Sequence, residues 1–381
     1  MEEFCRGCEQ KLPIDIWLEL PNMPKRAQFF PDKKELKDDK GMNFVLKQCP
    51  YCGLIQAVGE PVFYYKDVIR AAGVSDEMFF YRKKQFQSWV AHYNLSGKKI
   101  LEIGCGKGFF MRAMEQAGVI VYGLEHNKDA VHVGNEEGHK IIRGFIEGEQ
   151  YQIPGALYDG FYCIQFLEHI PKPANFLRGI ANNLVDGGVG ILEVPNFEKA
   201  LEKAEYAEFI QDHLSYFTKK TLCNLLERNG FEVLYSESIM QDIILSLIVR
   251  KRVTYSVKGF KDTLDKRKLC MHGFLEIRLK QKKKIAVWGA SHISLTEISL
   301  LDMKDKISCI LDSAEFKQNR YSPVTHIPIL SPAYLDKGEI QTVIIMAGVY
   351  SQEVKKIMER DYPQIEGVIW AQGEFVYDLK N

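Results

Sequence analysis

The chain has 381 residues, of which 46% are hydrophobic and 26% charged, with 50 lysines and arginines against 50 aspartates and glutamates. This length is enough for two or three domains, and this composition is enough for several buried cores. The balanced charge disfavours a dedicated nucleic-acid-binding protein, which needs a cationic surface to neutralise phosphates, and favours a small-molecule partner.

The sequence contains no recognisable targeting or membrane segment. It begins MEEFCRGCEQ, which lacks the basic and apolar regions of a secretory signal, and no run approaches the ~20 apolar residues of a membrane helix. Nine cysteines, an odd number, fit a reducing compartment better than a disulfide framework. We therefore expect a soluble cytoplasmic protein. The absence of a coiled-coil repeat leaves monomer and dimer equally open.

Two pairs of cysteines stand near the start of the chain. Cys5 and Cys8 form one C-x-x-C pair, and Cys49 and Cys52 form another in the sequence CPYCG. Two residues between thiolates let both sulfurs turn onto one ion, and four thiolates close a tetrahedral zinc site without an open position. The surrounding segment has little helical periodicity, so metal would supply folding free energy that a small core lacks. We expect a structural Zn²⁺ here; the alternative is four unrelated free thiols.

Strands alternate with amphipathic helices from Lys98 onward. The predicted strands are 98–103, 119–124, 161–165, 190–194, 231–237 and 243–249, and the predicted helices run to about 116 and over 129–137, 174–185 and 218–229. Such alternation predicts a mostly parallel sheet covered on both faces. A charged helical stretch over 253–284 is followed by a second strand–turn–helix series from Ile285.

The strongest local motif is ILEIGCGKGFF, in which a strand runs into Gly104, Gly106 and Gly108 and then into a helix. The glycines permit a tight turn and let a ligand lie against bare backbone at a helix N-terminus. Glu125 ends the next strand, where a carboxylate can bind both ribose hydroxyls of a nucleoside. The dinucleotide fingerprint G-x-G-x-x-G is not matched, because Phe109 follows Gly108.

Three segments then appear in order: E-I-G-C-G-K-G at 102–108, G-L-E-H at 123–126 and L-E-H-I-P-K-P at 167–173. They resemble the class I methyltransferases, and the resemblance implies S-adenosylmethionine as methyl donor. Glu168 and His169 could serve as an acid and a base, but the resemblance implies that they cap the corner between strand and helix. The residues that it places around the donor are Gly104, Cys105, Gly106 and Gly108 near the methionine moiety, Glu125 on the ribose, Phe145 near the adenine and Gln165 near the sulfonium.

The flanking segments narrow the resemblance. Four further features are similar to the three-domain, zinc-containing sugar C-methyltransferases. They are the cysteine pairs, E-V-P-N-F at 193–197, D-H-L-S-Y-F-T at 212–218 and R-Y-S-P-V-T-H-I-P-I at 320–329. Members of that family methylate a carbon of a nucleotide-linked 4-keto sugar. The resemblance covers essentially the whole chain and implies a nucleotide-linked sugar as the small-molecule substrate.

Such a reaction needs a base, because a carbon beside a ketone must lose a proton before it attacks a methyl sulfonium. His213 titrates near neutrality and stands beside Asp212, so we expect His213 to be the general base and Asp212 to orient it. The family has Glu-His at this place. The alternative is that both residues buttress the segment that follows.

The chain departs from the family at three places. Ile210 replaces a tyrosine, the C-terminal turn 289–294 lacks the Lys-Gly of G-A-x-x-K-G, and the segment MPKRAQFF at 23–30 is atypical. An O- or N-methyltransferase acting on another sugar, a polysaccharide or a metabolite therefore stays an alternative. A more remote one is a non-catalytic scaffold that binds S-adenosylmethionine.

The domain organisation that we expect is a zinc-binding module at 1–58, a methyltransferase domain with its entry segment at 59–252, and a linker helix with an α/β substrate-binding domain at 253–381. The fold class is α/β, with a Rossmann-like methyltransferase fold and a second Rossmann-like domain at the C-terminus. Without G-x-G-x-x-G, this last domain is not expected to bind a second dinucleotide. We expect it to hold the nucleotide end of the substrate.

Overall fold

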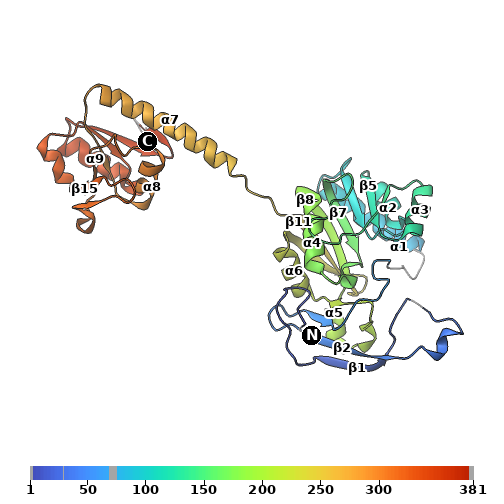
Figure 1. Cartoon of the computed structure of the whole chain (residues 1–381). Coiled ribbons are helices and arrows are strands. Elements are labelled where there is room, and N and C mark those ends of the chain that lie inside the picture. Colours follow the sequence, from blue (N-terminus) through green and yellow to red (C-terminus); the bar gives the residue numbers. More distant parts are fainter. Residues whose placement is uncertain (1–2, 29, 68–74, 377–381) are drawn as a thin grey trace. The chain divides into compact units, whose positions relative to one another are not determined.

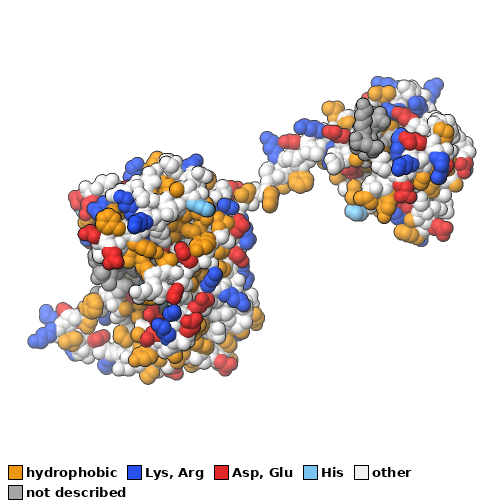
Figure 2. All heavy atoms as spheres, turned by 180° about the vertical axis from the view of Figure 1, so that it is seen from behind, with side chains coloured by type: hydrophobic (Ala, Val, Ile, Leu, Met, Phe, Trp, Pro, Cys, Tyr) orange, Lys and Arg blue, Asp and Glu red, His pale blue; other side chains and the backbone are white. Residues whose placement is uncertain are grey.

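The structure is a computed structural model that describes residues 3–28, 30–67 and 75–376. The chain divides into two compact units, Met1–Thr254 and Tyr255–Asn381, which are treated separately below (Figure 1). No helix in the described part of the chain is long and apolar enough to cross a membrane. Acidic and basic side chains lie interspersed on the face shown in Figure 2, in keeping with the balanced composition.

A seven-stranded sheet forms the centre of the first unit, with the strand order β10-β11-β8-β7-β4-β5-β6. Strands β4 to β8 run parallel, and the hairpin of β10 and β11 adds two antiparallel strands to β8. The strands are β4 (Lys99–Ile103), β5 (Ile120–Glu125), β6 (Ile141–Arg143), β7 (Tyr158–Ile164), β8 (Leu184–Pro195), β10 (Phe231–Ile239) and β11 (Ile244–Lys251). The predicted parallel sheet is thus confirmed.

Helices cover both faces of this sheet, as the alternating sequence pattern predicted (Figure 1). Apolar side chains of α4 and α6 pack on one face, and those of α1 and α2 pack on the other. The helices of the unit are α1 (Asp76–His92), α2 (Phe109–Glu115), α3 (Lys128–Glu136), α4 (Pro173–Asn182), α5 (Phe197–Lys203) and α6 (Lys219–Arg228). The predicted cap of α6 is present, because the Thr218 side chain accepts the Thr221 amide.

The predicted end of the helix at 174–185 is wrong. Helix α4 ends at Asn182, and Leu184 already pairs with Tyr158 as the first residue of β8. The buried Asn183 side chain is the cause: its amide donates to the carbonyls of Tyr151 and Gly179, and its oxygen accepts the Ile153 amide. These bonds fix the chain in a turn where apolar periodicity alone would continue the helix.

The first unit contains a second, four-stranded sheet. It contains β1 (Leu18–Met23), β2 (Met42–Gln48), β3 (Ile55–Ala57) and β9 (Ser215–Tyr216), in that order. Because β9 comes from the loop before α6, the N-terminal segment completes its sheet with a strand from the middle of the chain. The segment predicted as a module at 1–58 therefore belongs to the same compact unit as the central sheet.

The second unit has a seven-stranded sheet of its own, with the order β14-β15-β13-β12-β16-β17-β18. Strand β12 pairs in parallel with β13 on one side and β16 on the other, which is the strand arrangement that leaves a crevice at the carboxyl ends. Its elements are α7 (Lys258–Lys280), β12 (Ile285–Trp288), α8 (His292–Leu300), β13 (Cys309–Leu311), β14 (Arg320–Tyr321), β15 (Pro328–Leu330), β16 (Thr342–Ile345), α9 (Ser351–Asp361), β17 (Glu366–Ala371) and β18 (Glu374–Val376).

A buried ion pair joins α1 to the central sheet, and its loss has a predictable cost. Arg82 lies 2.6 Å from Glu193 of β8, and both side chains are almost fully buried. Removing one partner leaves an uncompensated buried charge, so Arg82→Ala should lower the free energy of unfolding by about 3–5 kcal/mol. Denaturant titration measures this, with Lys84→Ala on the exposed face of α1 as the control. An Arg82→Ala loss no larger than that of the control would contradict a stabilising role for the pair.

Candidate functional site

The glycine turn after β4 has the backbone geometry that its sequence predicted. Gly104, Gly106 and Gly108 all have positive φ angles, 71°, 56° and 88°, and α2 begins at Phe109. The Gly104 amide donates to the carbonyl of Leu124 on the neighbouring strand, at 2.9 Å, which ties the turn to β5. An added Cβ at Gly106 would meet no atom within 4 Å, so the backbone there faces open space. A ligand can therefore approach this turn closely.

Glu125 ends β5 directly beside the turn. Its carboxylate accepts the amides of Gly106 and Asn127, each at 2.8 Å. The side chain is buried, and burial raises its pKa above the ordinary value. These bonds hold the carboxylate in a fixed position at the carboxyl edge of the sheet, which suits recognition of neutral hydroxyl groups.

An aromatic recess lies next to Glu125. It is lined by Phe145, Phe166 and Phe176 together with the backbone of Gly104. The three rings pack with centroids about 6 Å apart, at 6.3, 6.2 and 5.9 Å. The ring planes are inclined to one another by 63°, 39° and 47°. An apolar aromatic surface beside a fixed carboxylate offers the two kinds of contact that a nucleoside, a base joined to a ribose, uses.

The segment 64–67 runs across this recess. Tyr65 packs edge-on against Phe145 with ring centroids 5.8 Å apart, and the Lys66 ammonium lies 4.9 Å from the same ring. Asp67 bonds to the ring of His126, the residue after Glu125, at 2.7 Å. None of these contacts was predicted from the sequence, because they join segments about sixty to eighty residues apart whose proximity no local motif encodes.

The two other residues predicted at the donor site differ in exposure. The Cys105 side chain is buried in the core between sheet and helix, so only its backbone faces the turn. Gln165 follows β7 with a φ of 51°, and its side chain is exposed at the carboxyl edge of the sheet. Glycine turn, carboxylate and aromatic recess therefore fit the nucleoside and methionine parts of S-adenosylmethionine.

A second polar cluster lies at the same edge of the sheet. Glu168 and His169 form the 3₁₀ turn η2 (Leu167–His169) that follows β7, and His213 comes from the loop before β9. The carboxylate and imidazole atoms of the three residues all lie within 4.8 Å of one another. The rings of His169 and His213 meet edge to face with centroids 4.8 Å apart. The structure thus brings the predicted base next to two residues for which capping a corner was the favoured role and acid–base chemistry the alternative.

Two hydrogen bonds clamp the loop of His213 onto η2. The His169 Nδ1–H donates to the Asp212 carbonyl at 2.8 Å, and the Leu214 amide donates to the Glu168 carbonyl at 2.8 Å. Because Nδ1 of His169 carries the donated hydrogen, its Nε2 is the bare nitrogen and faces Glu168 at 3.9 Å. The cluster is therefore held rigidly by backbone contacts.

Orientation of His213 by Asp212 stays a prediction, because the Asp212 carboxylate has other partners. It accepts the Tyr64 hydroxyl and the Ala27 amide, both at 2.9 Å. The Asp212 backbone, through His169, positions the loop. Burial raises the pKa of Tyr64 to about 12, so its hydroxyl keeps the hydrogen that it donates. Tyr64 is thus a site residue that the sequence did not single out among the tyrosines near it.

Burial shifts the titration of the cluster strongly. It lowers the pKa of His213 to about 3, with a further contribution from His169, and it raises the pKa of Glu168 to about 8. His213 is accordingly a neutral imidazole at physiological pH and can accept a proton. One carboxylate oxygen of Glu168, Oε2, is buried without a hydrogen-bond partner.

The four predicted cysteine ligands come together in the structure. The sulfurs of Cys5 and Cys52 lie 3.5 Å apart, those of Cys8 and Cys49 also 3.5 Å apart, and all four lie within 4.8 Å of one another. Sulfurs bound at about 2.3 Å around one tetrahedral ion have separations of this size. The arrangement fits a closed Zn²⁺ site with no position for a substrate.

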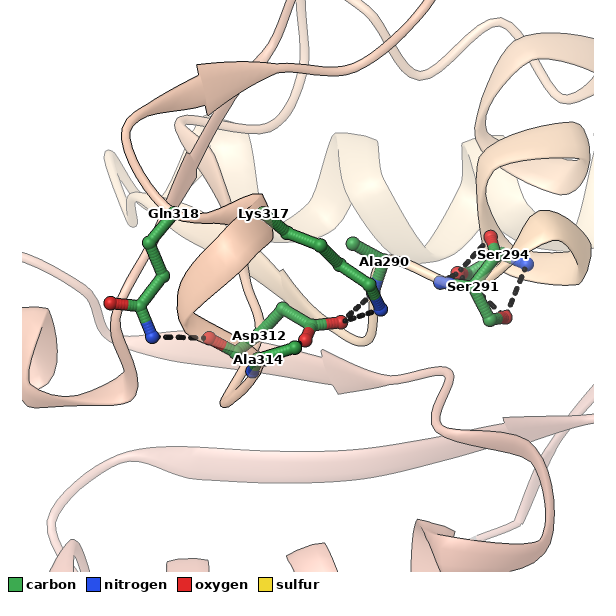
Figure 3. Close-up of polar contacts among 7 residues, drawn as sticks. All are labelled: Ala290, Ser291, Ser294, Asp312, Ala314, Lys317 and Gln318. Atoms are coloured by element: carbon green, nitrogen blue, oxygen red, sulfur yellow. Dashed lines mark hydrogen bonds and ion pairs between the residues drawn. The ribbon is translucent and has the colours of Figure 1, made fainter.

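The second unit contains a carboxylate that is held by backbone amides much as Glu125 is. Asp312 follows β13 and accepts the Ala290 amide at 2.8 Å, the Ala314 amide at 2.9 Å and the Lys317 ammonium at 2.9 Å (Figure 3). Glu125 accepts a turn amide and the amide two residues beyond itself in the same way. The second carboxylate differs in having a lysine partner, so the pair has no net charge.

The turn after β12 also resembles the first one. The Gly289 amide donates to the Leu311 carbonyl at 2.8 Å, as Gly104 does to Leu124. Gly289 has a φ of 124°, and an added Cβ would lie 2.6 Å from the Met346 carbonyl oxygen. Ser291 and Ser294 cap the start of α8 reciprocally (Figure 3). Both units therefore present a glycine turn and a carboxylate at the carboxyl edge of a parallel sheet.

Comparison with known protein families covers both units. Residues 78–236 match the methyltransferase domain family, and residues 250–376 match the family described as the C-methyltransferase C-terminal domain. The C-methyltransferase NovU from Streptomyces niveus is 25% identical over 238 residues, which cover 60% of this chain and 56% of NovU. The ubiquinone biosynthesis O-methyltransferase from Aeromonas salmonicida is 33% identical over 155 residues, which cover 36% of this chain and 65% of that enzyme. The chain thus spans between half and two thirds of the length of these curated relatives.

Solved structures were also compared. A protein from Pyrococcus horikoshii aligns with a TM-score of 0.41 and 14% identity over 50% of this chain and 98% of its own. An S-adenosylmethionine-dependent methyltransferase from Clostridium acetobutylicum aligns with a TM-score of 0.38 and 10% identity over 45% of this chain and 92% of its own. From the two family matches, residues 78–236 form a methyltransferase domain and residues 250–376 form a C-methyltransferase C-terminal domain.

Proposed function

We propose that this methyltransferase methylates a carbon atom of a nucleotide-linked 4-keto sugar, with His213 as general base. The observation that carries the proposal is the pairing of two sites on one sheet edge. The donor recess at Glu125 and the half-buried imidazole of His213 both lie at the carboxyl ends of the parallel strands β4, β5 and β7. C-methylation requires a base beside the donor, because the acceptor carbon must first lose a proton. Transfer to a stronger nucleophile, such as a hydroxyl or an amine, depends less on a base.

The side chains divide the work as follows. When bound, S-adenosylmethionine supplies a methyl group on a sulfonium whose sulfur keeps the electron pair as the methyl leaves. Glu125 holds the ribose, and Phe145 packs against the adenine. His213, neutral at physiological pH, takes the proton from the carbon beside the ketone. The clamp between η2 and the loop of His213 fixes the base so that positioning contributes to the rate.

Two findings favour carbon as the acceptor atom and a nucleotide as the part of the substrate that the protein binds away from the reacting carbon. The second unit matches the C-methyltransferase C-terminal domain, and NovU, a C-methyltransferase, aligns over more of the chain than the O-methyltransferase does. The turn at Gly289 and the neutralised pair of Asp312 and Lys317 suit the phosphates of a nucleotide better than an unpaired carboxylate would. Binding energy from that remote part would position the sugar.

Transfer to a hydroxyl group is the second candidate function. A ubiquinone biosynthesis O-methyltransferase is 33% identical to this chain over 155 residues, a higher identity than that of NovU. The same imidazole of His213 would then take a hydroxyl proton. This candidate does not account for the match of residues 250–376 to the C-methyltransferase C-terminal domain.

Incubation with methyl-deuterated S-adenosylmethionine tests the proposal. A panel of nucleotide-linked sugars should contain each 4-keto sugar beside the same sugar reduced to the 4-alcohol. Mass spectrometry should show the labelled methyl group on keto sugars alone. Labelling of the alcohols to the same extent would contradict C-methylation, because their ring carbons carry no acidic hydrogen and only their hydroxyls remain as acceptors.

Glu125 gives a prediction that does not depend on the acceptor. Glu125→Ala should weaken binding of S-adenosylhomocysteine by roughly 10- to 100-fold, since it removes a charged hydrogen-bond acceptor worth about 1.5–3 kcal/mol. Isothermal titration calorimetry measures the affinity, and Glu137→Ala, an exposed glutamate after α3, is the matched control. Unchanged affinity in Glu125→Ala would remove Glu125 from the donor site.

A further inference from the structure

In the cluster of Glu168, His169 and His213, the N–H of His169 is bonded outside the cluster, so a ring hydrogen for the Glu168 carboxylate has to come from His213. His169 uses its hydrogen on Nδ1 for the Asp212 carbonyl, so its Nε2 is bare. Glu168 is only 2% exposed, and its Oε2 is buried without a hydrogen-bond partner. A carboxylate and imidazole nitrogens aimed at one another in a dry site are stable only when a proton or another cation is shared among them.

The groups around Glu168 do not supply that cation. The titratable side chains that face it are His169 on the same turn, His213 and Asp212 on the opposing loop, and Cys163 on β7. The Asp212 carboxylate is turned toward Tyr64, and burial raises the pKa of the Cys163 thiol, which stays neutral. Among the residues that the structure describes, neither lysine nor arginine pairs with Glu168.

We propose that Glu168 receives, through His213, the proton that is removed from the acceptor. The inference rests on the proposed function, in which His213 takes that proton. A buried imidazolium would be costly at His213, whereas a buried carboxyl group at Glu168 is stable when it is protonated. The polar atoms of the cluster lie within 4.8 Å of one another, a range that one hydrogen bond or a single bridging water molecule spans.

The transfer balances without a further reactant. The C–H bond of the acceptor breaks toward one ring nitrogen of His213, and its electron pair stays on the carbon that takes the methyl group. The hydrogen on the other ring nitrogen passes to the carboxylate of Glu168. His213 is neutral before and after the step, and Glu168 changes from carboxylate to carboxylic acid. Glu168 acts through His213 and is thus a positioning and proton-accepting residue that does not touch the acceptor.

The proposal predicts a specific pH dependence. Glu168 accepts a proton only when it is ionised, and its pKa of about 8 lies above the ordinary glutamate value. The rate of methyl transfer should therefore rise with pH through about 8. His213, with a pKa of about 3, is neutral across this range and adds no step of its own. Glu168→Gln should lower the rate at pH 9 by on the order of 10² and abolish the rise.

Two measurements test the proposal separately from the identity of the acceptor. Ring resonances of His169 and His213 in histidine-labelled protein should shift with a midpoint near pH 8, and this shift should vanish in Glu168→Gln. Kinetic profiles of wild type, Glu168→Gln and Glu168→Asp then test the transfer itself. Glu168→Asp should retain a pH-dependent rise, and Glu227→Gln, an exposed glutamate on α6, should behave as wild type.

Three outcomes would overturn the proposal. The first is a Glu168→Gln enzyme that keeps the rise in rate with pH. The second is the absence of a titration near pH 8 in the histidine resonances. The third is a second divalent metal ion per chain that is lost in Glu168→Gln, since the cluster would then be a metal site. Failure of every sugar to react while the histidine titration is present would refute the proposed acceptor and leave the shared proton of the cluster intact.

Discussion

Replacement of His213 by alanine is expected to lower the rate of methyl transfer by about 10²–10⁴-fold, the usual contribution of a positioned base. The affinity for S-adenosylhomocysteine should not change, because the proposed donor site at Glu125 and the aromatic recess does not include His213. Single-turnover kinetics and calorimetry measure the two quantities. This separation of rate from donor affinity distinguishes a base from a residue that supports the donor site.

The base can also be tested without the donor. In D₂O the wild-type enzyme should exchange the hydrogen beside the ketone of its acceptor for deuterium, and His213→Ala should not. His132→Ala, an exposed histidine on α3, is the matched control and should exchange as the wild type does. A His213→Ala enzyme that turns over within severalfold of wild type would show that another group removes the proton.

Substitution of a cysteine in the cluster Cys5, Cys8, Cys49 and Cys52 is expected to have the second large effect, the loss of a bound zinc ion. Protein purified without chelator is expected to contain about one zinc ion per chain, and Cys49→Ser should lose it. Zinc contributes ~10–16 kcal/mol of binding free energy in small zinc peptides, and here it would join the segment of Cys5 and Cys8 to the turn after β2. Loss of the ion should therefore increase hydrogen exchange of β2 and β3.

A matched substitution controls for the removal of a thiol. Cys270 is exposed on α7 of the second unit. Cys270→Ser should therefore keep the zinc ion and the hydrogen-exchange protection of β2 and β3. Elemental analysis gives the metal content and mass-detected hydrogen exchange gives the protection. Folded protein that contains no metal, with β2 and β3 fully protected, would contradict a structural zinc site.

Much of the fold was predictable because its determinants are local. The strands β4 and β5 are short apolar runs that end at a glycine turn and at a carboxylate, and the Thr218 cap marks the start of α6. The boundary between α4 and β8 was missed because the Asn183 side chain bonds to residues about thirty positions earlier. Periodicity reports which face of an element is apolar and does not report such contacts.

The same distinction separates the predicted and the missed parts of the site. Glu125 and the turn at Gly104 lie about twenty residues apart in one strand–turn–helix–strand unit, so a local motif identifies both. Asp212 was assigned to His213 because the two are neighbours in sequence. Its partners are Tyr64 and Ala27, which are 148 and 185 residues away. Only the folded chain brings them to the carboxylate.

Carbon methylation of a nucleotide-linked keto sugar is the central claim, and the bond that the new methyl group makes tests it most directly. The product formed with ¹³C-methyl S-adenosylmethionine should be examined by carbon NMR. We expect the labelled methyl carbon to couple to a ring carbon adjacent to the keto group. A labelled methyl carbon bonded to oxygen or nitrogen would contradict the claim and would make the chain an O- or N-methyltransferase with a C-methyltransferase C-terminal domain.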